Sequence, residues 1–503
     1  MWSPRSCLNS SRRQNNLLGF VLLWLVSFCH NWLLGVNRAD EVWFFTVAKM
    51  VSEGALPYRD FAFPVLPTSL YLAAVFLTLV GKQLLAFKAF VAGITAGLAW
   101  LASQVFCQLG GPRGRRWWFL LTCLVLAPSL PGSPYGVLAY LFLVAGLSAT
   151  LKGLREPGSW PWILAGLFAG LGFTAKHNLG LLALLAVLVA QRQGKPGVRW
   201  RHRIAVLGAF GLPVLLSLVP VFLSASWDQF YQGVFGTKAV YARTAFTVPL
   251  QGRLTGVPPS VVFTPAEDFL RLALRGLAFA SVGFAVGSLL WLWRRKSEGR
   301  REPMVLGLFL AVAVATAFPR FDSEHVLPIV PLALVPLTLR AEAQAWRFLR
   351  LWHVAAAALL AASWLLALVS LRQGVWRPSQ LPSLQGVRLS LAETRHVEET
   401  LAFLGALPRE ESVLFIGPYA AFYYTVSQRK APTRYLLPLV TCLGDNGQRD
   451  LLTTLERVPI RWLCWQTGRW PLRPQLLEQL VTTHWQLVAT TGECHWYRRP
   501  PPS

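Results

Sequence analysis

The chain of 503 residues has few charged side chains. Asp, Glu, Lys and Arg make up 14% of it, and hydrophobic residues make up 54%. Globular domains carry about 25% charged residues. Long uncharged runs near 20 residues predict membrane-spanning helices, because lipid offers the backbone no hydrogen-bond partners. The alternating ten-residue segments of a transmembrane β-barrel are missing from the sequence. We therefore expect a mainly α-helical, polytopic membrane protein.

Acidic residues are scarce as well. There are 23 Asp and Glu against 48 Lys and Arg, so the formal net charge is +25. In a soluble protein this excess would indicate nucleic-acid binding, but the sequence has no motif of a nucleic-acid-binding module. The basic residues instead concentrate in short loops between apolar runs, as the positive-inside rule predicts for cytoplasmic loops. We therefore expect membrane lipids and no nucleic acid among the partners.

Several catalytic and metal-binding motifs are also missing. No CxxC pair, HExxH sequence, P-loop or Ser-His-Asp order occurs, which leaves zinc-protease, nucleotide-binding and soluble-hydrolase functions without support. The seven cysteines are scattered. Three of them lie near the C-terminus and allow at most one disulfide with each other, and the spacing leaves open whether one forms: Cys442, Cys464 and Cys494.

The apolar runs predict about eleven spans, several of them shorter than a full crossing needs. Arg5, Arg12 and Arg13 precede the first run, which is too long for a signal peptide and is expected to stay as an anchor with a cytoplasmic N-terminus. This arrangement divides the chain into a membrane domain, 1–372, and an extracytoplasmic domain, 373–503. The expected spans are 17–35, 84–106, 117–128, 136–151, two within 160–189, 204–224, 272–293, 304–318, 326–339 and 351–371.

The first outer loop, 37–82, is expected to hold two helices at the membrane surface. Residues 38–53 form an amphipathic pattern, with Trp43 on the apolar face and Val42 on the other. Asn37 is a candidate N-cap for this helix. Pro67 opens a second short helix that ends at Gly81.

The tail alternates strand-like and helix-like segments, which predicts a small α/β domain. The expected strands are 412–416, 459–465 and 485–488, and the expected helices are 391–404, 420–426 and 474–481.

Asp40 and Glu41 stand at the mouth of the first span, where a carboxylate is costly unless it is used or solvated. One interpretation is a general base, or a ligand of a divalent ion. The other is that Asp40 stabilises the first turn of the outer helix through the helix dipole. The residues by themselves leave both open.

Two further polar groups are expected on the outer side. Lys176 interrupts a long apolar run, either to bind a phosphate or as an exposed hairpin tip. Arg320, Asp322 and His325 crowd a short turn that is either an anion or sugar contact or a charged turn of little energetic weight. Arg243, in the second outer loop, is another candidate phosphate contact.

Several stretches stand out together: 39–41 (ADE), 52–60 (SEGALPYRD), 166–180 (GLFAGLGFTAKHNLG), 319–322 (PRFD), 413–416 (VLFI) and 421–424 (AFYY). This set resembles the GT-C glycosyltransferases, in particular the bacterial branch related to protein O-mannosyltransferases and lipid A aminoarabinose transferases. Those enzymes carry an acidic residue at the start of the first outer loop and use polyprenyl-phosphate sugar donors.

The resemblance implies an inverting transfer on the outer side of a bacterial inner membrane, to a lipid, glycan or protein acceptor. Asp40 would be the base, with Glu41 beside it as a catalytic neighbour or a contact to a divalent metal ion. The implied donor-phosphate contacts are Lys176, Arg320 and Arg243, and the implied substrate contacts are Tyr58, Arg59, Asp322 and His325. Two other functions stay open at this point: a multi-span transporter or flippase without catalysis, and a polysaccharide ligase or polymerase.

Overall fold

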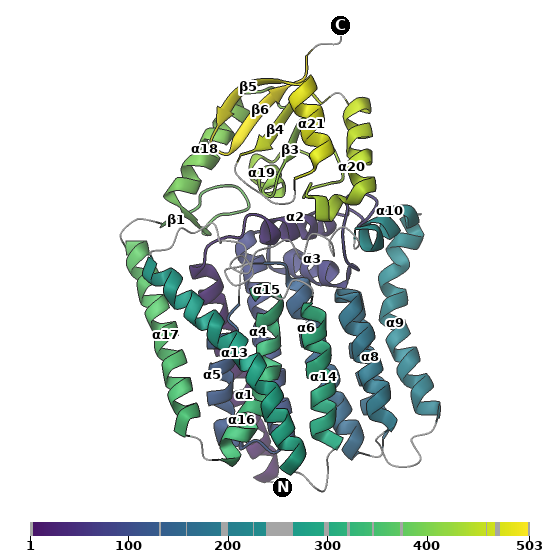
Figure 1. The fold of residues 1–503 in the computed structure, drawn as a ribbon, viewed down its shortest axis with the longest axis vertical. Helices are drawn as coiled ribbons and strands as arrows, with labels where there is room; N and C mark the ends of the chain where they lie inside the picture. Colours follow the sequence, from purple (N-terminus) through teal and green to yellow (C-terminus); the bar gives the residue numbers. More distant parts are fainter. Residues whose placement is uncertain are drawn as a thin grey trace.

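The computed structural model describes residues 4–129, 132–156, 158–192, 200–224, 226–237, 265–295, 301–318, 322–344, 347–372, 376–458, 460–467 and 473–500. Within these residues a bundle of long helices occupies one part of the molecule, and a small α/β domain covers one end of the bundle (Figure 1).

Each of the eleven predicted apolar runs is helical. Among the described residues, six helices are long and apolar enough to cross a membrane, and the chain is a multi-pass helical membrane protein. The remaining five are shorter or less apolar, so the count of eleven crossings stays a prediction. The bundle helices are α1 (Pro4–Leu33), α4 (Leu84–Gln108), α5 (Arg116–Leu126), α6 (Pro134–Arg155), α7 (Trp160–Ala175), α8 (His177–Arg192), α9 (Trp200–Ser224), α13 (Pro265–Arg295), α14 (Arg301–Ala317), α16 (Val330–Ala343) and α17 (Arg347–Arg372).

Two glycines let α7 approach α9 closely. A Cβ at Gly166 would lie 2.4 Å from the backbone oxygen of Val206, and a Cβ at Gly170 would lie 2.4 Å from that of Phe210. Small residues at such spacing allow close packing of membrane helices.

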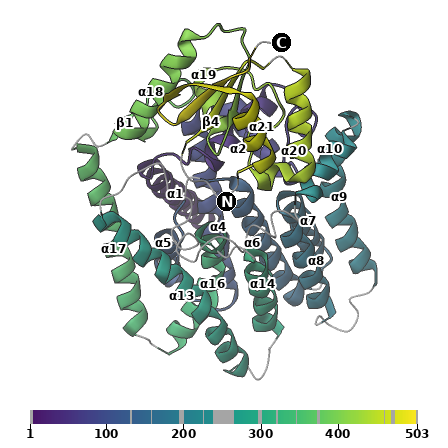
Figure 2. The same cartoon turned by 45° about the horizontal axis from the view of Figure 1, so that its top comes forward.

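The outer loop forms α2 (Asp40–Ser52) and α3 (Thr68–Val80), close to the expected bounds. The expectation of a surface helix with one exposed face is wrong for α2. Val42, placed on the polar face by the sequence pattern, is fully buried. The reason is that α2 lies between the bundle and the α/β domain (Figures 1 and 2). Thr46 on α2 is hydrogen-bonded to Thr425 of that domain, with 2.6 Å between the hydroxyl oxygens.

The α/β domain contains a four-stranded sheet in the order β3-β4-β6-β5, with β3 and β4 parallel and the other pairs antiparallel. A separate antiparallel pair, β1 and β2, precedes it. The strands are β1 (Trp376–Pro378), β2 (Arg388–Ser390), β3 (Val413–Ile416), β4 (Trp462–Gln466), β5 (Gln486–Thr491) and β6 (Cys494–Arg498), and the helices are α18 (Leu391–Ala406), α19 (Ala420–Ser427), α20 (Val440–Arg457) and α21 (Gln475–His484).

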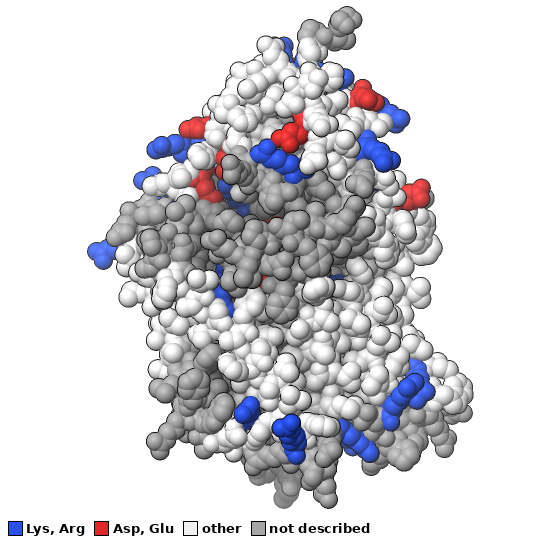
Figure 3. Space-filling view, viewed as in Figure 1, with Lys and Arg blue, Asp and Glu red and all other residues white. Residues whose placement is uncertain are grey.

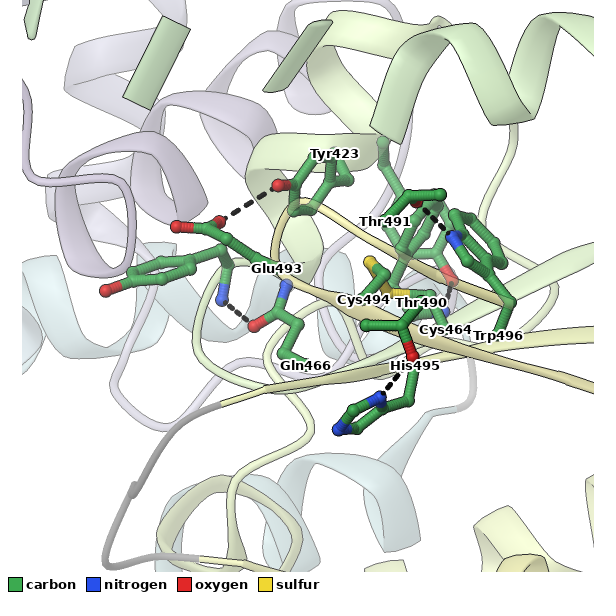
Figure 4. The surroundings of a disulfide bond; sticks show 12 residues. Tyr423, Cys464, Gln466, Thr490, Thr491, Glu493, Cys494, His495 and Trp496 are labelled. Atoms are coloured by element: carbon green, nitrogen blue, oxygen red, sulfur yellow. Dashed lines mark hydrogen bonds between the residues drawn. A yellow bond between two sulfur atoms is a disulfide. The ribbon is translucent and has the colours of Figure 1, made fainter. Parts of the chain in front are cut away.

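A disulfide joins Cys464 on β4 to Cys494 on β6 (Figure 4). The sequence alone did not decide whether a disulfide forms.

Five short elements complete the described structure: η1 (Arg113–Arg115), α10 (Trp227–Tyr231), η2 (Gln232–Gly236), α15 (Ser323–Val326) and η3 (Leu327–Ile329).

Candidate active site

Asp40 begins α2, directly after the turn that leaves α1. The Oδ1 atom of Asn37 accepts hydrogen bonds from the backbone N–H groups of Ala39 and Asp40, each at 3.1 Å. Asn37 thus orders the turn before α2, but the predicted N-cap at Asn37 is wrong: the helix begins at Asp40, and its N-cap residue is Ala39, which has no side-chain capping bond. Asp40 is half-buried, and the hydroxyl of Ser133 lies 3.5 Å from its backbone oxygen.

Glu41 is fully buried and takes part in a polar network. Its Oε1 atom accepts a hydrogen bond from Nζ of Lys88 at 2.7 Å, and its Oε2 atom accepts one from the backbone N–H of Asn37 at 3.1 Å. Lys88 also donates to Oδ1 of Asn31 and to the backbone oxygen of Gly35, so all three of its N–H donors are used. Glu41 thereby anchors the first turn of α2 to α1 and α4.

The residues around Asp40 do not fit a metal ion. Both carboxylate oxygens of Glu41 already accept hydrogen bonds from Lys88 and Asn37. Within the described parts of the chain, no group of three or more His, Cys, Asp and Glu side chains is arranged to hold a metal ion. Biological Mg²⁺ and Ca²⁺ sites usually combine several oxygen ligands, so no step is assigned to a metal below.

Lys176 lies at the sharp junction between α7 and α8, half-buried. Its Nζ atom donates to the backbone oxygen of Thr316 at 3.0 Å and lies 5.7 Å from the ring centroid of Tyr140. Thr316 lies in the last turn of α14, so Lys176 is hydrogen-bonded to the end of that helix.

Asp322 and His325 form a pair at the start of α15. Oδ1 of Asp322 lies 2.7 Å from Nδ1 of His325 and also accepts a hydrogen bond from the backbone N–H of His325 at 3.1 Å. The structure thus brings these two predicted contacts together. Arg320 and Arg243 lie outside the described residues.

The remaining two predicted contacts, Tyr58 and Arg59, differ in their exposure to solvent. Tyr58 is 1% exposed, and its hydroxyl donates to the backbone oxygen of Val65 at 2.6 Å, so it has a packing role in this structure. Arg59 is exposed and forms a bidentate pair with Asp60 at 2.8 Å for both bonds.

Helix α6 connects the surroundings of Asp40 and Lys176. Ser133, which contacts the backbone of Asp40, immediately precedes α6, and Tyr140, which lies under Lys176, is seven residues further on. Tyr140 lies in the second turn of α6, so both contacts are near the N-terminal end of this helix. Asp40 and Lys176 are therefore held at the same end of the bundle.

Sequence reasoning missed the buried Arg38, which joins the active-site loop to the α/β domain. Its guanidinium donates to both oxygens of Glu493, at 2.6 and 2.8 Å, and contacts Glu393 at 3.2 Å. It also lies 4.1 Å from the ring centroid of Tyr419. The hydroxyl of Tyr423 donates to Glu493 at 2.9 Å (Figure 4).

Burial sets the electrostatics of this cluster. Although burial of Glu493 opposes ionisation, its hydrogen bonds and charge contact with Arg38 hold the pKa of that carboxyl below its ordinary value. Burial raises the pKa of Glu393, against the influence of Arg38.

The sequence contained one signal of this cluster. Ser390 and Glu393 have capping-box spacing, and they form that motif at the start of α18.

No protein-family model matches the chain, and no curated protein matches its sequence. Solved structures do match. The crystal structure of ArnT from Cupriavidus metallidurans in the apo state superposes with a TM-score of 0.52 at 14% identity, covering 96% of this chain and 98% of that one. The arabinofuranosyltransferase AftD from Mycobacteria gives a TM-score of 0.49 at 14% identity, covering 97% of this chain and 40% of that one. The match to ArnT extends over nearly the full length of both chains, and it shows that the chain has the same fold as ArnT.

Proposed function

We propose that the chain is an integral-membrane glycosyltransferase. It transfers a sugar from a polyprenyl-phosphate donor to a lipid, glycan or protein acceptor, with inversion and with Asp40 as the base. The fold is consistent with this activity, because the ArnT structure that it matches belongs to a lipid A aminoarabinose transferase.

The observation that carries the proposal is that Asp40 and Lys176 lie at the same end of α6. Ser133, just before the helix, contacts the backbone oxygen of Asp40, and Tyr140, in its second turn, contacts Lys176. In the proposed complex the donor lies between these two residues, with its phosphate near Lys176 and its anomeric carbon toward Asp40.

In the proposed reaction, Asp40 accepts the proton of an acceptor hydroxyl or amine. The acceptor atom forms a bond to the anomeric carbon, while the bond from that carbon to the phosphate oxygen breaks. The electron pair of that bond leaves with the polyprenyl phosphate. Negative charge grows on the leaving phosphate, and Lys176 stabilises it electrostatically. Attack opposite the leaving group inverts the anomeric carbon.

The other site residues have supporting roles in this proposal. Glu41 orients α2 through Lys88, and does not exchange protons with the substrate, because its oxygens are hydrogen-bonded inside the protein. Asp322 and His325 contact the donor beside Lys176, and Arg59 contacts the acceptor. Arg320 and Arg243 are further proposed phosphate contacts.

We place the reaction on the outer side of the bacterial inner membrane. On the face drawn in Figure 3, the end of the bundle opposite the α/β domain shows Lys and Arg side chains and no Asp or Glu among the coloured residues, whereas both signs of charge are mixed around the α/β domain. A purely basic end agrees with the positive-inside rule for a cytoplasmic end. The disulfide between Cys464 and Cys494 supports an oxidising location for the α/β domain.

The test is a transfer assay with the full chain in proteoliposomes, using polyprenyl-phosphate sugars labelled in the sugar and envelope extracts as acceptors. We expect labelled sugar to move to an extract component while free polyprenyl phosphate appears in equal amount. Movement of the intact labelled lipid between leaflets, without release of the sugar, would support a transporter and contradict the proposal.

A further inference from the structure

A polar cleft lies between the α/β domain and the end of α9. Two adjoining cavities form it, with volumes of about 420 and 220 Å³, and both are lined by Gln229, Arg434, Tyr435 and Asp450. The larger volume falls within the range of about 300–1,000 Å³ that is typical of small-molecule sites.

The walls of the cleft come from three chain segments that are hydrogen-bonded to one another. On one side, the amide of Asn446 on α20 donates to Oε1 of Gln232 on η2 at 3.0 Å. On another, the backbone N–H of Ala62 donates to the backbone oxygen of Arg434 at 2.9 Å. Helices α20 and α10 lie side by side in both ribbon views (Figures 1 and 2). The cleft is therefore part of the folded structure.

Close backbone approach shapes the floor of the cleft. A Cβ at Gly233 would lie 2.7 Å from the backbone oxygen of Phe63, so this position requires glycine. Gly444 has a φ of 63°, which kinks α20 where it meets η2. The five residues 232–236 form a π-helix, a rare element that is frequent at functional sites.

The charges in the cleft are compensated. Arg434 is paired with Asp450 at 3.1 Å, and Arg59, at the rim, is paired with Asp60. The hydroxyl of Tyr435 donates to Oδ2 of Asp450 at 2.8 Å, and burial raises the pKa of Tyr435 to about 12, so this hydroxyl keeps its proton near neutral pH. With each arginine matched by a carboxylate, the cleft has no excess positive charge to attract an anion.

The other lining groups of the larger cavity are mainly hydroxyls and an amide, and the smaller cavity adds the amides of Gln232 and Asn446 and the apolar side chains of Ala62, Cys442 and Leu443. The larger cavity is bordered by Ser224, Ser226, Thr433 and Thr454, and by Gln229. The Gln229 side chain is exposed and has no hydrogen-bond partner within the described part of the chain. Hydroxyl and amide groups donate and accept hydrogen bonds at once, as sugar hydroxyls do. Apart from Pro432, this cavity has no apolar residue in its lining, which disfavours an apolar ligand.

We propose that this cleft binds a neutral saccharide, and that the saccharide belongs to the acceptor. The second part rests on the proposed function and narrows its acceptor from a lipid, glycan or protein to a molecule that carries neutral sugar residues. The cleft is formed by residues other than Asp40 and Lys176, so binding there does not require the transfer reaction.

The test is saturation-transfer-difference NMR on the full chain in detergent micelles. The probes are the methyl glycosides of mannose, glucose, galactose and arabinofuranose, and a matching phosphorus NMR titration uses inorganic phosphate. We expect saturation transfer to at least one glycoside and no phosphate binding that depends on the cleft. Gln229→Ala should weaken glycoside binding about five-fold, and Asp450→Asn about ten-fold, as expected for losing a neutral and a charged hydrogen bond.

Thr482→Ala is the matched control, because Thr482 borders a separate cavity on α21. This variant should bind the glycosides as the wild type does. Because Asp450 takes part in folding contacts, Gln229→Ala decides the outcome if Asp450→Asn unfolds. Absence of saturation transfer to all four glycosides, or transfer that Gln229→Ala leaves unchanged, would overturn the inference. Glycoside binding without sugar transfer in the proteoliposome assay would contradict the proposed function and leave the saccharide site standing.

Discussion

Nζ of Lys88 lies 2.7 Å from Oε1 of Glu41, and both side chains are fully buried. This ion pair joins α4 to the first turn of α2, one residue after Asp40. This buried ion pair therefore fixes the start of α2, and with it the position of Asp40, the candidate base.

Replacing Lys88 by Met would leave the Glu41 carboxyl buried without its cation. We expect a loss of about 3–5 kcal/mol in the free energy of unfolding, because removing one member of a buried pair strands the other. The double variant Lys88→Met with Glu41→Leu should recover most of that loss. Thermal unfolding in detergent measures both effects.

The control for this prediction is Lys82→Met. Lys82 pairs with Glu53 at 3.6 Å, and both side chains are about half exposed. An exposed pair contributes less than about 1 kcal/mol. An equal loss in the free energy of unfolding for the two lysine substitutions would contradict the claim that the buried Lys88–Glu41 pair stabilises the fold more than an exposed pair.

Glu493→Gln should loosen the attachment of the α/β domain to the loop that carries Asp40. The substitution removes the charge that holds the buried Arg38, so we expect faster amide hydrogen exchange in 38–45 and in the β5–β6 hairpin. Hydrogen exchange followed by mass spectrometry reports both segments. Glu478→Gln, which breaks the exposed pair with Arg473, should leave exchange in 38–45 unchanged. If exchange near Asp40 is insensitive to Glu493, the domain is not held through Arg38.

The same contact predicts a pH dependence. The pKa of Glu493 is lower in the folded protein than in the unfolded chain, where it is about 4.3. Its stabilisation is therefore fully present above that value and is lost as the pH falls through the lowered pKa. We expect the difference in Tm between the wild type and Glu493→Gln to be constant near neutral pH and to shrink below about pH 4.3. A difference that grows on acidification would contradict this assignment.

Much of the helical framework could be predicted, because each apolar run has to satisfy its own backbone hydrogen bonds in lipid. The start of α2 was predicted to within two residues: Asn37 was expected as the N-cap, and its side chain instead accepts a hydrogen bond from the backbone N–H of Asp40, where the helix begins. The partners of Glu41 and Arg38 could not be predicted. Lys88 is 47 residues from Glu41, and Glu493 is 455 residues from Arg38. No local pattern encodes contacts of such separation.

The α/β domain shows the same limit. Its short apolar strands near 413–416 and 462–466 were predicted, but α20 and β6 were not. The segment of α20 contains Gly444 and Gly447, which lower helix propensity, and its helix is interrupted at Gly444. Strand β6 lies inside the sheet, with β4 paired to one edge and β5 to the other, and it alternates buried and partly exposed side chains.

A labelling experiment tests the location of the α/β domain. In intact cells, an alkylating reagent applied before reduction should leave Cys464 and Cys494 unmodified, and a second reagent applied after reduction should label both. This follows from the disulfide between them, which persists only in an oxidising compartment. Labelling of either cysteine by the first reagent would contradict an extracytoplasmic α/β domain.

The most direct test of the proposed function is Asp40→Asn in the proteoliposome transfer assay, with Asp228→Asn as the control. Asp228 is an exposed acid on α10 and lines neither cavity of the cleft. Removing a general base typically lowers the rate by about 10²–10⁴-fold. We expect that loss for Asp40→Asn, with unchanged thermal unfolding and a wild-type rate for Asp228→Asn. Undiminished sugar transfer by a folded Asp40→Asn variant would contradict the account.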